Sequence, residues 1–409
     1  MPDHRLPVRR RRVARTLLAR LGFAIGRRLP LRRRVVLAVS HAPRPTGNLA
    51  IIGEELRRRH PDLEVVTVSM YRPARFLGRF APLLGAVRSG YHLATARVVV
   101  VDDYYFPMYV VRPRPGTMRI QVWHAAGAFK MFGYSVVAKR FGADLDMIRH
   151  VRLHSNYSLA LVSSMSVARH YAEAFDQPPG LFTSRIGFPR ADILVDPARK
   201  AAGEARARAA FPGLEGRTVV LYAPTFRGET IGRARYEDLL DLEELHRVLG
   251  DGYAVLLRRH PFVRERPMIP QGLEGFAIEA SAYPDVNELM LISDILVTDY
   301  SSVIYEFALL GRPILFLAPD EQAYELERGF YFDFRAEAPG LIVETTSALA
   351  AVIRDGVFDL ERVRAFARAS FDVADGNATR RLVEEVIMPA LAGETVTAAT
   401  LEAPATGRD

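Results

Sequence analysis

The sequence contains no cysteine and only one tryptophan among its 409 residues. Without cysteine there can be no disulfide, no thiolate metal site and no cysteine nucleophile. The same absence leaves the cellular compartment open. The sequence also has no uninterrupted run of about 20 apolar residues, which a membrane-spanning helix would need.

Several familiar signatures of phosphate and metal sites are missing as well. There is no G-x-x-x-x-G-K-[ST] loop, no G-x-G-x-x-G after the first strand-like run and no H-E-x-x-H. Asp144 and Asp146 have the spacing of a metal-binding acidic pair, but they stand in a helix-like stretch. We interpret them as part of a solvated helix face.

The composition is that of a globular protein with an uneven charge. At about 100 to 200 residues per domain, the length indicates two or three domains, and 49% hydrophobic with 25% charged residues excludes wholesale disorder. The net charge is +8, yet residues 1–34 alone hold twelve arginines and one acid, Asp3. That segment therefore carries +11, and the remaining 375 residues sum to −3.

The apolar residues of this basic segment recur at helical spacing. Val13, Leu17, Leu21 and Ala24 or Ile25 would form one stripe with arginines beside it, a pattern typical of a helix on an anionic membrane surface. Arg20 interrupts the apolar stretch, and no small-residue cleavage site follows, which excludes a secretory signal. A solvated, frayed terminus is one alternative. A nucleic-acid arm is another, although no aromatic residues are interleaved for base stacking.

Strand-like and helix-like runs alternate along the rest of the chain. Two such series, separated by a polar Ala/Arg-rich stretch at 196–216, predict two doubly wound α/β domains with ligands at the carboxyl ends of the strands. Strands are expected at 35–39, 63–68, 96–101, 119–123 and 159–163, then at 218–222, 253–257, 295–298 and 313–317. Helices are expected at 48–59, 239–249 and 303–310.

The predicted domain limits follow from this alternation. They are a basic amphipathic segment at 1–34, an N-terminal domain at 35–185, a C-terminal domain at 186–392 and a disordered tail at 393–409.

A polar cluster follows the predicted strand 295–298. Asp299 ends the strand, and Ser301 and Ser302 precede a helix, where capping hydroxyls and free backbone amides attract phosphate. Glu306 would face the same space and could bind hydroxyls of a ribose or polyol. Helix capping by Ser302 is the simpler explanation, but it does not account for the whole cluster.

The single tryptophan stands in a second cluster. Trp123 and His124 come at a strand end, and small residues around Gly127 would let the backbone approach a ligand closely. Lys130 could neutralise a phosphate. An isolated histidine is more often structural than catalytic.

A second histidine, His260, follows another predicted strand with Arg258 and Arg259 before it. Two histidines from the two halves of the chain would suit a general base and a group that stabilises phosphate.

Two smaller turns also present arginines. Arg190 lies in the turn 186–192, while Thr225, Phe226 and Arg227 follow the predicted strand 218–222. Arginine forks suit diphosphate oxygens, although solvated arginines in turns are common.

Taken in order, these motifs make the chain resemble the CDP-glycerol glycerophosphotransferase family, which includes teichoic-acid polymerases and primases. The resemblance covers about residues 45 to 380. It rests on Trp123-His124 with Gly127 and Lys130, and on the segments 187–192, 222–227, 259–261, 298–302, 328–334 and 375–376.

The resemblance implies a GT-B fold, in which two Rossmann-like domains face a cleft, with no bound metal and no other cofactor. It implies that the C-terminal domain holds a CDP-activated donor and that His124 and His260 are the essential histidines. The positions matching the donor-contact motifs are Arg190, Thr225, Phe226, Arg258, His260, Ser301, Ser302 and Glu306.

Three departures from the family pattern lie beside the expected donor. The chain has Ala125-Ala126-Gly127 where Gly-Thr-Pro is common, Glu306 where aspartate is usual and Ala191 where asparagine is usual. They leave the polyol open: glycerol, ribitol or another.

The predicted function is transfer of glycerol phosphate, or a related polyol phosphate, from CDP-glycerol to a hydroxyl of a lipid-linked envelope polymer, releasing CMP. The expected partners are this donor, this acceptor and an anionic membrane surface at the cytoplasmic face, with no nucleic acid. A GT-B glycosyltransferase that uses a nucleotide sugar is the enzymatic alternative. A non-catalytic protein that binds anionic lipid or polymer through residues 1–34 is the other.

Overall fold

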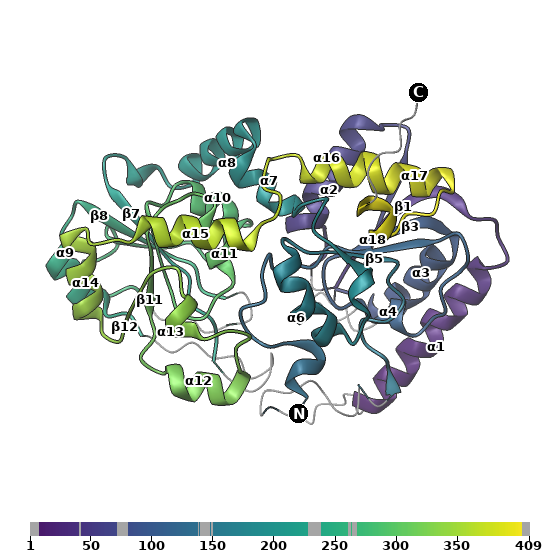
Figure 1. Cartoon of the computed structure of the whole chain (residues 1–409), viewed down its shortest axis with the longest axis horizontal. Helices are drawn as coiled ribbons and strands as arrows, with labels where there is room; N and C mark the ends of the chain where they lie inside the picture. Colours follow the sequence, from purple (N-terminus) through teal and green to yellow (C-terminus); the bar gives the residue numbers. More distant parts are fainter. Residues whose placement is uncertain are drawn as a thin grey trace. The chain divides into compact units, whose positions relative to one another are not determined.

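A computed structural model of the chain describes residues 8–40, 42–71, 81–137, 139, 148, 150–227, 239–260, 263 and 268–402. Asp144, Asp146 and Pro261 of the motifs above lie outside these residues. The chain folds into two compact units (Figure 1). Unit 1 comprises Met1–His124, Asp144–Arg190 and Asn377–Asp409, and unit 2 comprises Ala125–Ala143 and Ala191–Gly376.

Unit 1 contains a six-stranded sheet in the order β2-β1-β3-β4-β5-β6, and every pairing is parallel. Its central strands are buried β-branched runs such as Val98–Val101, as expected of a parallel sheet covered on both faces. The strands are β1 (Arg32–Val39), β2 (Glu64–Ser69), β3 (Ala96–Val101), β4 (Met118–Gln121), β5 (Leu159–Leu161) and β6 (Phe182–Thr183).

Segments from both ends of the chain contribute helices to unit 1. In Figure 1 the late helices α16 and α17 lie beside α2 and the strands β1 and β3. The helices are α1 (Val8–Gly26), α2 (Gly47–Arg59), α3 (Ala81–Thr95), α4 (Phe106–Tyr109), α6 (Met165–Phe175), α16 (Ala378–Arg381), a π-helix (Leu382–Ile387), α17 (Met388–Ala392) and α18 (Ala398–Glu402).

Helix α1 packs closely against α3 through small residues. Ala19 is fully buried, and a Cβ added at Gly22 would stand 2.0 Å from the carbonyl oxygen of Val87. A Cβ added at Gly90 of α3 would likewise stand 2.0 Å from the carbonyl oxygen of Ala19. Glycine at these positions allows the two backbones to approach, and it fixes which face of α1 turns inward.

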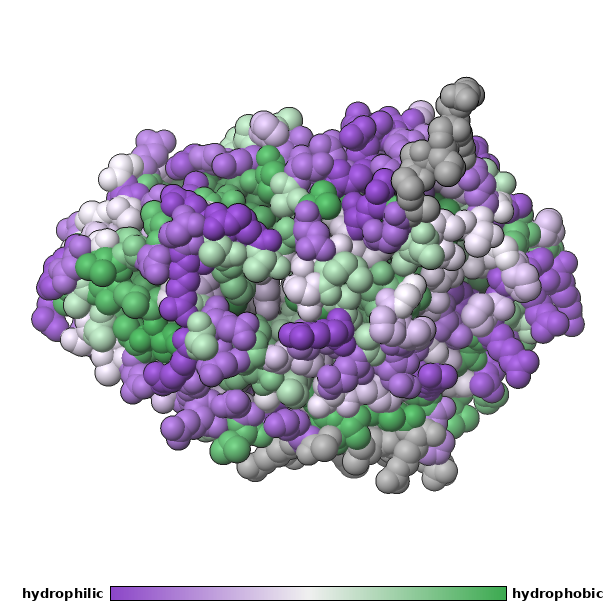
Figure 2. Space-filling model, in the orientation of Figure 1, coloured by the Kyte–Doolittle hydropathy of each residue, from purple (hydrophilic) through white to green (hydrophobic). Residues whose placement is uncertain are grey.

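The predicted apolar stripe lies on the other side of α1. Val13, Leu17, Leu21 and Ile25 are 52, 59, 52 and 46% exposed. At 3.6 residues per turn they stand roughly opposite the packed face that holds Ala19. Figure 2 shows hydrophobic surface beside hydrophilic surface over the first half of α1, at the lower right of the view. Among the described residues, no helix is both long and apolar enough to cross a membrane.

Unit 2 contains a second six-stranded parallel sheet, in the order β12-β11-β10-β7-β8-β9. One face packs onto a core that includes Val220, Leu245, Val255, Val297 and Leu349. The strands are β7 (Thr218–Tyr222), β8 (Tyr253–Leu257), β9 (Ala277–Glu279), β10 (Ile295–Thr298), β11 (Ile314–Leu317) and β12 (Leu341–Val343).

The helices of unit 2 connect these strands and cover the sheet, with α14 packed on α9 and α15 on α11. They are α7 (Asp192–Val195), α8 (Pro197–Ala210), α9 (Leu242–Leu249), α10 (Val286–Leu291), α11 (Val303–Ala308), α12 (Glu321–Arg328), α13 (Phe334–Glu337), α14 (Thr346–Asp355) and α15 (Leu360–Ser370). Short 3-10 turns lie at Gly133–Val136, Pro179–Leu181, Pro189–Ala191 and Pro212–Leu214.

The two doubly wound domains are confirmed, but several predicted limits differ. The stretch 196–216, expected only to separate the two series, contains α8, where a Cβ at Gly203 would lie 3.0 Å from Leu291 of α10. Residues 125–143 belong to unit 2, although they were predicted within the N-terminal domain. Residues 377–392 pack on unit 1 instead of ending the C-terminal domain. The predicted disordered tail contains α18, which buries Leu401 and bonds Thr183 through Glu402.

Candidate active site

The strand order of unit 1 places β1 between β2 and β3, so the direction of winding changes beside β1 and β3. Ligands of doubly wound sheets bind at the carboxyl ends of strands near such a point. Ser40 follows β1 there, Asp102 and Asp103 follow β3, and His124 follows β4.

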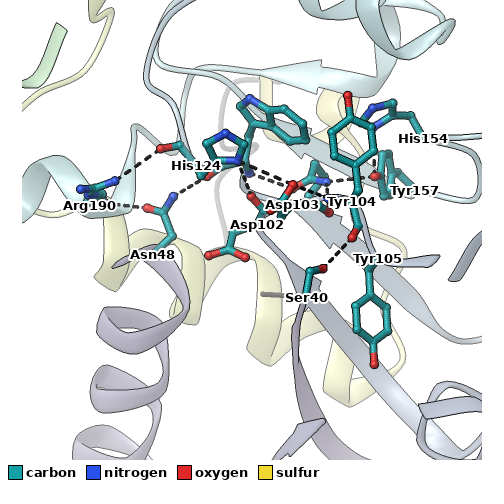
Figure 3. Close-up of polar contacts among 12 residues, drawn as sticks. Ser40, Asn48, Asp102, Asp103, Tyr104, Tyr105, His124, His154, Tyr157 and Arg190 are labelled. Atoms are coloured by element: carbon teal, nitrogen blue, oxygen red, sulfur yellow. Dashed lines mark hydrogen bonds and ion pairs between the residues drawn. The ribbon is translucent and has the colours of Figure 1, made fainter. Parts of the chain in front are cut away.

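His124 is an exposed side chain held by its Nδ1 atom (Figure 3). Nδ1 lies 3.2 Å from the carbonyl oxygen of Asp102 and 3.9 Å from a carboxylate oxygen of Asp103. Because a carbonyl oxygen can only accept, Nδ1 must carry the proton and donate it. The neutral ring then keeps its lone pair on Nε2, the tautomer that a general base requires.

The turn that presents His124 is strained. Trp123 has a φ of 47°, a left-handed conformation that is unusual for a bulky residue. The buried Gln121 holds this turn, since its Oε1 accepts the Trp123 amide at 2.8 Å. Its Nε2 donates to the hydroxyl of Tyr157 at 2.9 Å and to the carbonyl of Asp103 at 3.3 Å.

Asn48 of α2 secures the other side of the same turn. Its amide donates to the carbonyl of Trp123, and its Oδ1 accepts the backbone amide of Arg190 at 2.9 Å. The Arg190 guanidinium donates to the carbonyl of His124 at 3.4 Å. Arg190, predicted in the C-terminal domain, therefore lies in unit 1 beside His124 (Figure 3).

An aromatic layer supports the turn from the interior. The Trp123 ring is buried and lies against Tyr104, His154 and Phe175 at centroid distances of 5.4, 5.5 and 5.1 Å. Burial lowers the pKa of His154 to about 3, so His154 is neutral and packs as an aromatic ring. The observed contacts of Trp123, predicted to bind substrate, are internal.

In unit 2 the winding changes between β7 and β10. Asp299, at the end of β10, is 1% exposed and accepts hydrogen bonds from residues that follow β7. Its carboxylate receives the Thr225 amide at 2.8 Å, the Thr225 hydroxyl at 2.9 Å and Arg227 Nη1 at 2.8 Å. Asp299 thus organises the two strand ends where a ligand is expected.

Arg227 is buried between two carboxylates. Besides Asp299, it makes a two-pronged contact with Asp320 at 2.7 and 3.1 Å. Its guanidinium also lies over the rings of Tyr300 and Tyr324, 5.4 and 4.9 Å from their centroids. The positive charge of Arg227 is therefore already compensated by two carboxylates of the protein.

Lys130 joins this cluster, although it is only six residues after His124. Backbone pairing with Phe330 holds it in unit 2, and its Nζ lies 6.0 Å from the Tyr324 ring centroid. Burial, aided by the nearby Arg328 and Arg227 and opposed by Asp299, lowers the pKa of Lys130 to about 7. A bound anion would favour the charged form of Lys130 and so raise this pKa.

Of the predicted residues that follow β8, His260 makes an aromatic contact, whereas Arg258 and Arg259 bond polar groups of the protein. His260 lies against Phe226 with ring centroids 4.8 Å apart, and the Arg328 guanidinium lies over the same Phe226 ring, 4.7 Å from its centroid. Arg259 is buried in an ion pair with Glu279, while Arg258 donates to the carbonyl of Ser281. Both arginines thus have structural partners.

The cluster before α11 differs in detail from simple capping. Ser302 makes no side-chain cap bond, and the Ser301 hydroxyl accepts the Val303 amide at 3.4 Å. Glu306 is buried on α11. A Cβ at Gly127 would stand 2.1 Å from the ring of Tyr305, so close packing on α11 accounts for this glycine.

Sequence reasoning did not select Asn48, Asp102, Asp103 or Gln121. Asp102 and Asp103 directly follow the predicted strand 96–101, so the strand-end rule used for the other clusters would have found them. Asn48 and Gln121 carry no such signal, because their roles depend on distant partners. Within the described ranges, no group of three or more histidine, aspartate or glutamate side chains is placed to hold a metal ion.

Comparison with known proteins decides the family. The sequence profile described as CDP-glycerol:poly(glycerophosphate) glycerophosphotransferase matches residues 22–388. The chain belongs to this family. Solved structures of the wall teichoic acid polymerase TagF share the fold: one aligns over 94% of each chain with a TM-score of 0.74 and 22% identity. The predicted family and GT-B fold class are confirmed.

Curated relatives of the family cover most of the chain. The teichoic acid ribitol-phosphate primase of Bacillus spizizenii is 37% identical over 353 residues, which cover 86% of this chain and 90% of the relative. The teichoic acid poly(ribitol-phosphate) polymerase of the same organism is 34% identical over 381 residues, covering 91% of this chain. Here the chain spans only 59% of the relative's length.

The dyad of His124 and Asp103 predicts the effect of Asp103→Asn in this family member. Asparagine can still accept the Tyr104 amide, which Asp103 Oδ1 now binds at 2.7 Å, so only the charge is lost. A charge pair about 4 Å apart in a water-like dielectric is worth ~1 kcal/mol, which predicts a fall in kcat of about fivefold with donor KM unchanged.

The measurement is steady-state turnover at two salt concentrations, because an exposed charge effect shrinks as salt rises. Asp62→Asn, which removes an exposed carboxylate after α2, is the matched control and should leave kcat unchanged. An Asp103→Asn enzyme with full kcat at low salt would refute the dyad.

Lys130 predicts proton uptake on donor binding. Its pKa of about 7 makes it largely neutral at pH 8, and a bound diphosphate favours the ammonium, so binding should take up close to one proton. Donor affinity should accordingly fall as pH rises through 7 to 9. Calorimetry in two buffers of different ionisation enthalpy, without acceptor, measures the uptake.

Lys130→Arg is the control, since arginine stays charged in this range. The variant should bind donor with proton uptake reduced by the Lys130 share and with a flatter pH dependence. Equal uptake by the wild type and Lys130→Arg would exclude Lys130 as the titrating group.

Proposed function

We propose that this protein transfers a polyol phosphate from a CDP-activated donor to a hydroxyl of a lipid-linked envelope polymer and releases CMP. The observation that carries the proposal is the geometry of His124, whose Nδ1 proton is committed to Asp102 and whose Nε2 is left to act as a base. The family match and the teichoic-acid relatives support the substrate class.

In the proposed reaction, His124 Nε2 accepts the proton of the acceptor hydroxyl. The acceptor oxygen then forms a bond to the phosphorus that carries the polyol. The bond from that phosphorus to the bridging oxygen breaks, and CMP leaves with the electron pair. Asp103, 3.9 Å from Nδ1, would stabilise the imidazolium formed.

Unit 2 would hold the donor diphosphate. Lys130 is the cation best suited to the charge that develops on CMP, because Arg227 is already engaged by Asp299 and Asp320. Positioning and electrostatic stabilisation of this kind are the main contributions to phosphoryl transfer. Donor contacts by His260, Phe226, Ser301, Ser302 and Glu306 remain part of the proposal, which involves no metal or other cofactor.

The identity of the polyol is the open point within this class. Four relatives named for ribitol phosphate are 32–37% identical to this chain. Those named for glycerol phosphate that align over more than 300 residues are 28–31% identical. We therefore expect CDP-ribitol to be a better donor than CDP-glycerol.

The test is CMP release by the purified chain with a lipid-linked acceptor analogue. CDP-ribitol, CDP-glycerol and nucleotide sugars are compared, with mass spectrometry of the product. His124→Ala should lower kcat by about 10²–10⁴, the usual contribution of a general base. His246→Ala, at a half-buried histidine of unit 2 paired with Asp251, should retain wild-type turnover.

Two outcomes would oppose the proposal. Near-full activity of His124→Ala would remove its assignment as base. Turnover of a nucleotide sugar alone would support a glycosyltransferase instead.

We also propose that α1 rests on an anionic membrane surface, where the acceptor would lie. The half-exposed stripe of Val13, Leu17, Leu21 and Ile25 would enter the interface, and Arg12 and Arg20 would face lipid phosphates. Arg15 is an exception, because it turns inward over the Phe106 ring at 5.1 Å.

The stripe predicts weaker vesicle binding for Leu17→Gln/Leu21→Gln. Losing about 1 kcal/mol of apolar burial per leucine should reduce binding to vesicles that contain phosphatidylglycerol by about thirtyfold. Sedimentation with the vesicles measures the loss.

Leu326→Gln/Val357→Gln is the matched control, because these side chains of unit 2 are 79% and 61% exposed and lie outside α1. It should sediment like the wild type. Equal sedimentation of the stripe variant and the wild type would refute the role of α1.

A further inference from the structure

Beside the exposed stripe, unit 1 contains an open cavity of about 370 Å³ that neither the donor nor the acceptor chemistry uses. It lies among α1, the end of α4 and the segment 150–152. Its basic lining residues are Arg12, Arg20, His150 and Arg152. None of the described residues that line it is acidic, so they offer an anion a positive environment.

The positions of these basic groups are partly fixed. Arg20 Nε donates to the carbonyl of Val110 at 2.9 Å, which holds its guanidinium at the cavity wall. Arg152 pairs with Asp176 at 3.3 Å, but both side chains are more than 60% exposed. An exposed ion pair contributes little free energy, so Arg152 can turn to a bound phosphate at small cost.

Thr16, Tyr109 and four apolar residues complete the described lining. Val13 and Leu17 of the stripe also line the cavity, together with Val110 and Val151. A ligand whose phosphate met the arginines would therefore continue onto the exposed apolar face of α1. Free phosphate would leave that face unused, whereas a lipid has both the anionic group and the chains to fill it.

We propose that this cavity binds the phosphodiester head group of an anionic membrane phospholipid, with the acyl chains directed along Val13 and Leu17. This inference rests on the proposed position of α1 at a membrane surface. It adds a stoichiometric lipid site to a general electrostatic attraction, and the two make different predictions for arginines inside and outside the cavity.

The test uses the full chain and monomeric dihexanoyl phosphatidylglycerol below its aggregation concentration, followed by titration calorimetry. Monomers carry no surface potential, so only a built site binds them. The wild type should bind one molecule saturably. Arg12→Gln/Arg152→Gln should weaken binding about thirtyfold, since a charge pair about 4 Å apart in a water-like dielectric is worth ~1 kcal/mol, or about fivefold, for each arginine.

Arg27→Gln/Arg28→Gln is the matched control. It removes the same charge from exposed positions just beyond the end of α1, outside the cavity, and should bind the monomer within about twofold of the wild type. Thermal unfolding of both variants checks that they fold. Equal loss in the two double variants, or no saturable binding by the wild type, would overturn the proposal.

Three further ligands distinguish the occupant. Dihexanoyl phosphatidylcholine, with the same phosphate and a compensating charge, should bind at least tenfold more weakly. Inorganic phosphate that bound as tightly as the lipid would indicate an anion site without lipid character. Farnesyl diphosphate that bound while phosphatidylglycerol did not would assign the cavity to the acceptor. Either result would contradict a phospholipid site.

The outcomes also separate this site from the proposed function. A chain that binds monomeric lipid but does not sediment with vesicles contradicts the membrane position alone. Sedimentation without saturable monomer binding contradicts the cavity alone. Transfer to a soluble acceptor analogue should be unchanged in Arg12→Gln/Arg152→Gln, because neither residue belongs to the catalytic groups.

Discussion

The arrangement of unit 2 depends on the buried ion pair of Asp299 and Arg227, whose Oδ2 and Nη1 atoms are 2.8 Å apart. Removing one partner of such a pair leaves an uncompensated charge in the interior, which typically costs several kcal/mol. The pair joins the end of β10 to the segment after β7, and Asp320 extends it to the region after β11. Because those ends are fixed, the more adaptable cation Lys130 can stand beside them with its pKa near 7. Rigid charges thus provide the setting in which a titrating one can respond to a ligand.

In unit 1, neutral side chains instead of charged ones hold the candidate site in place. The left-handed backbone at Trp123 would be unfavourable alone, and it persists because Gln121 and Asn48 bond both of its peptide groups. The His124 ring is therefore exposed, while hydrogen bonds hold the backbone of the turn that carries it. The base that we propose must be accessible to its substrate yet held in one tautomer, and the backbone carbonyl of Asp102 meets the second condition without adding a titrating group.

The sequence predicted most of the strands correctly, but it assigned some segments to the wrong unit. Buried β-branched runs such as 96–101 and 218–222 become strands with the expected bounds, because a parallel strand covered on both faces has a distinctive local composition. Thr225 and Asp299 were predicted to follow two different strands, and they meet because parallel strands share one carboxyl edge. Lys130 was expected in the N-terminal domain because chain order is all that a local pattern contains. Its pairing with Phe330, two hundred residues away, depends on tertiary packing that no short motif encodes. The short strands β6, β9 and β12 were missed for a related reason: two or three residues carry no periodicity.

One chain of hydrogen bonds runs through unit 1 from its surface cavity to the turn that presents His124. Tyr109 lines the cavity, and its hydroxyl lies 2.6 Å from that of Tyr157, which accepts from Gln121, the residue that holds the amide of Trp123. The wall that we assign to lipid is therefore built from the same buried network as the support of His124. The sequence of this wall is therefore constrained. A substitution at Tyr109 that suited a different membrane lipid would also have to preserve the hydrogen bond to Tyr157 and, through it, the one from Gln121. Adaptation to new lipids should accordingly accumulate on α1, where side chains change without disturbing the turn that presents His124, and spare the aromatic side of the cavity.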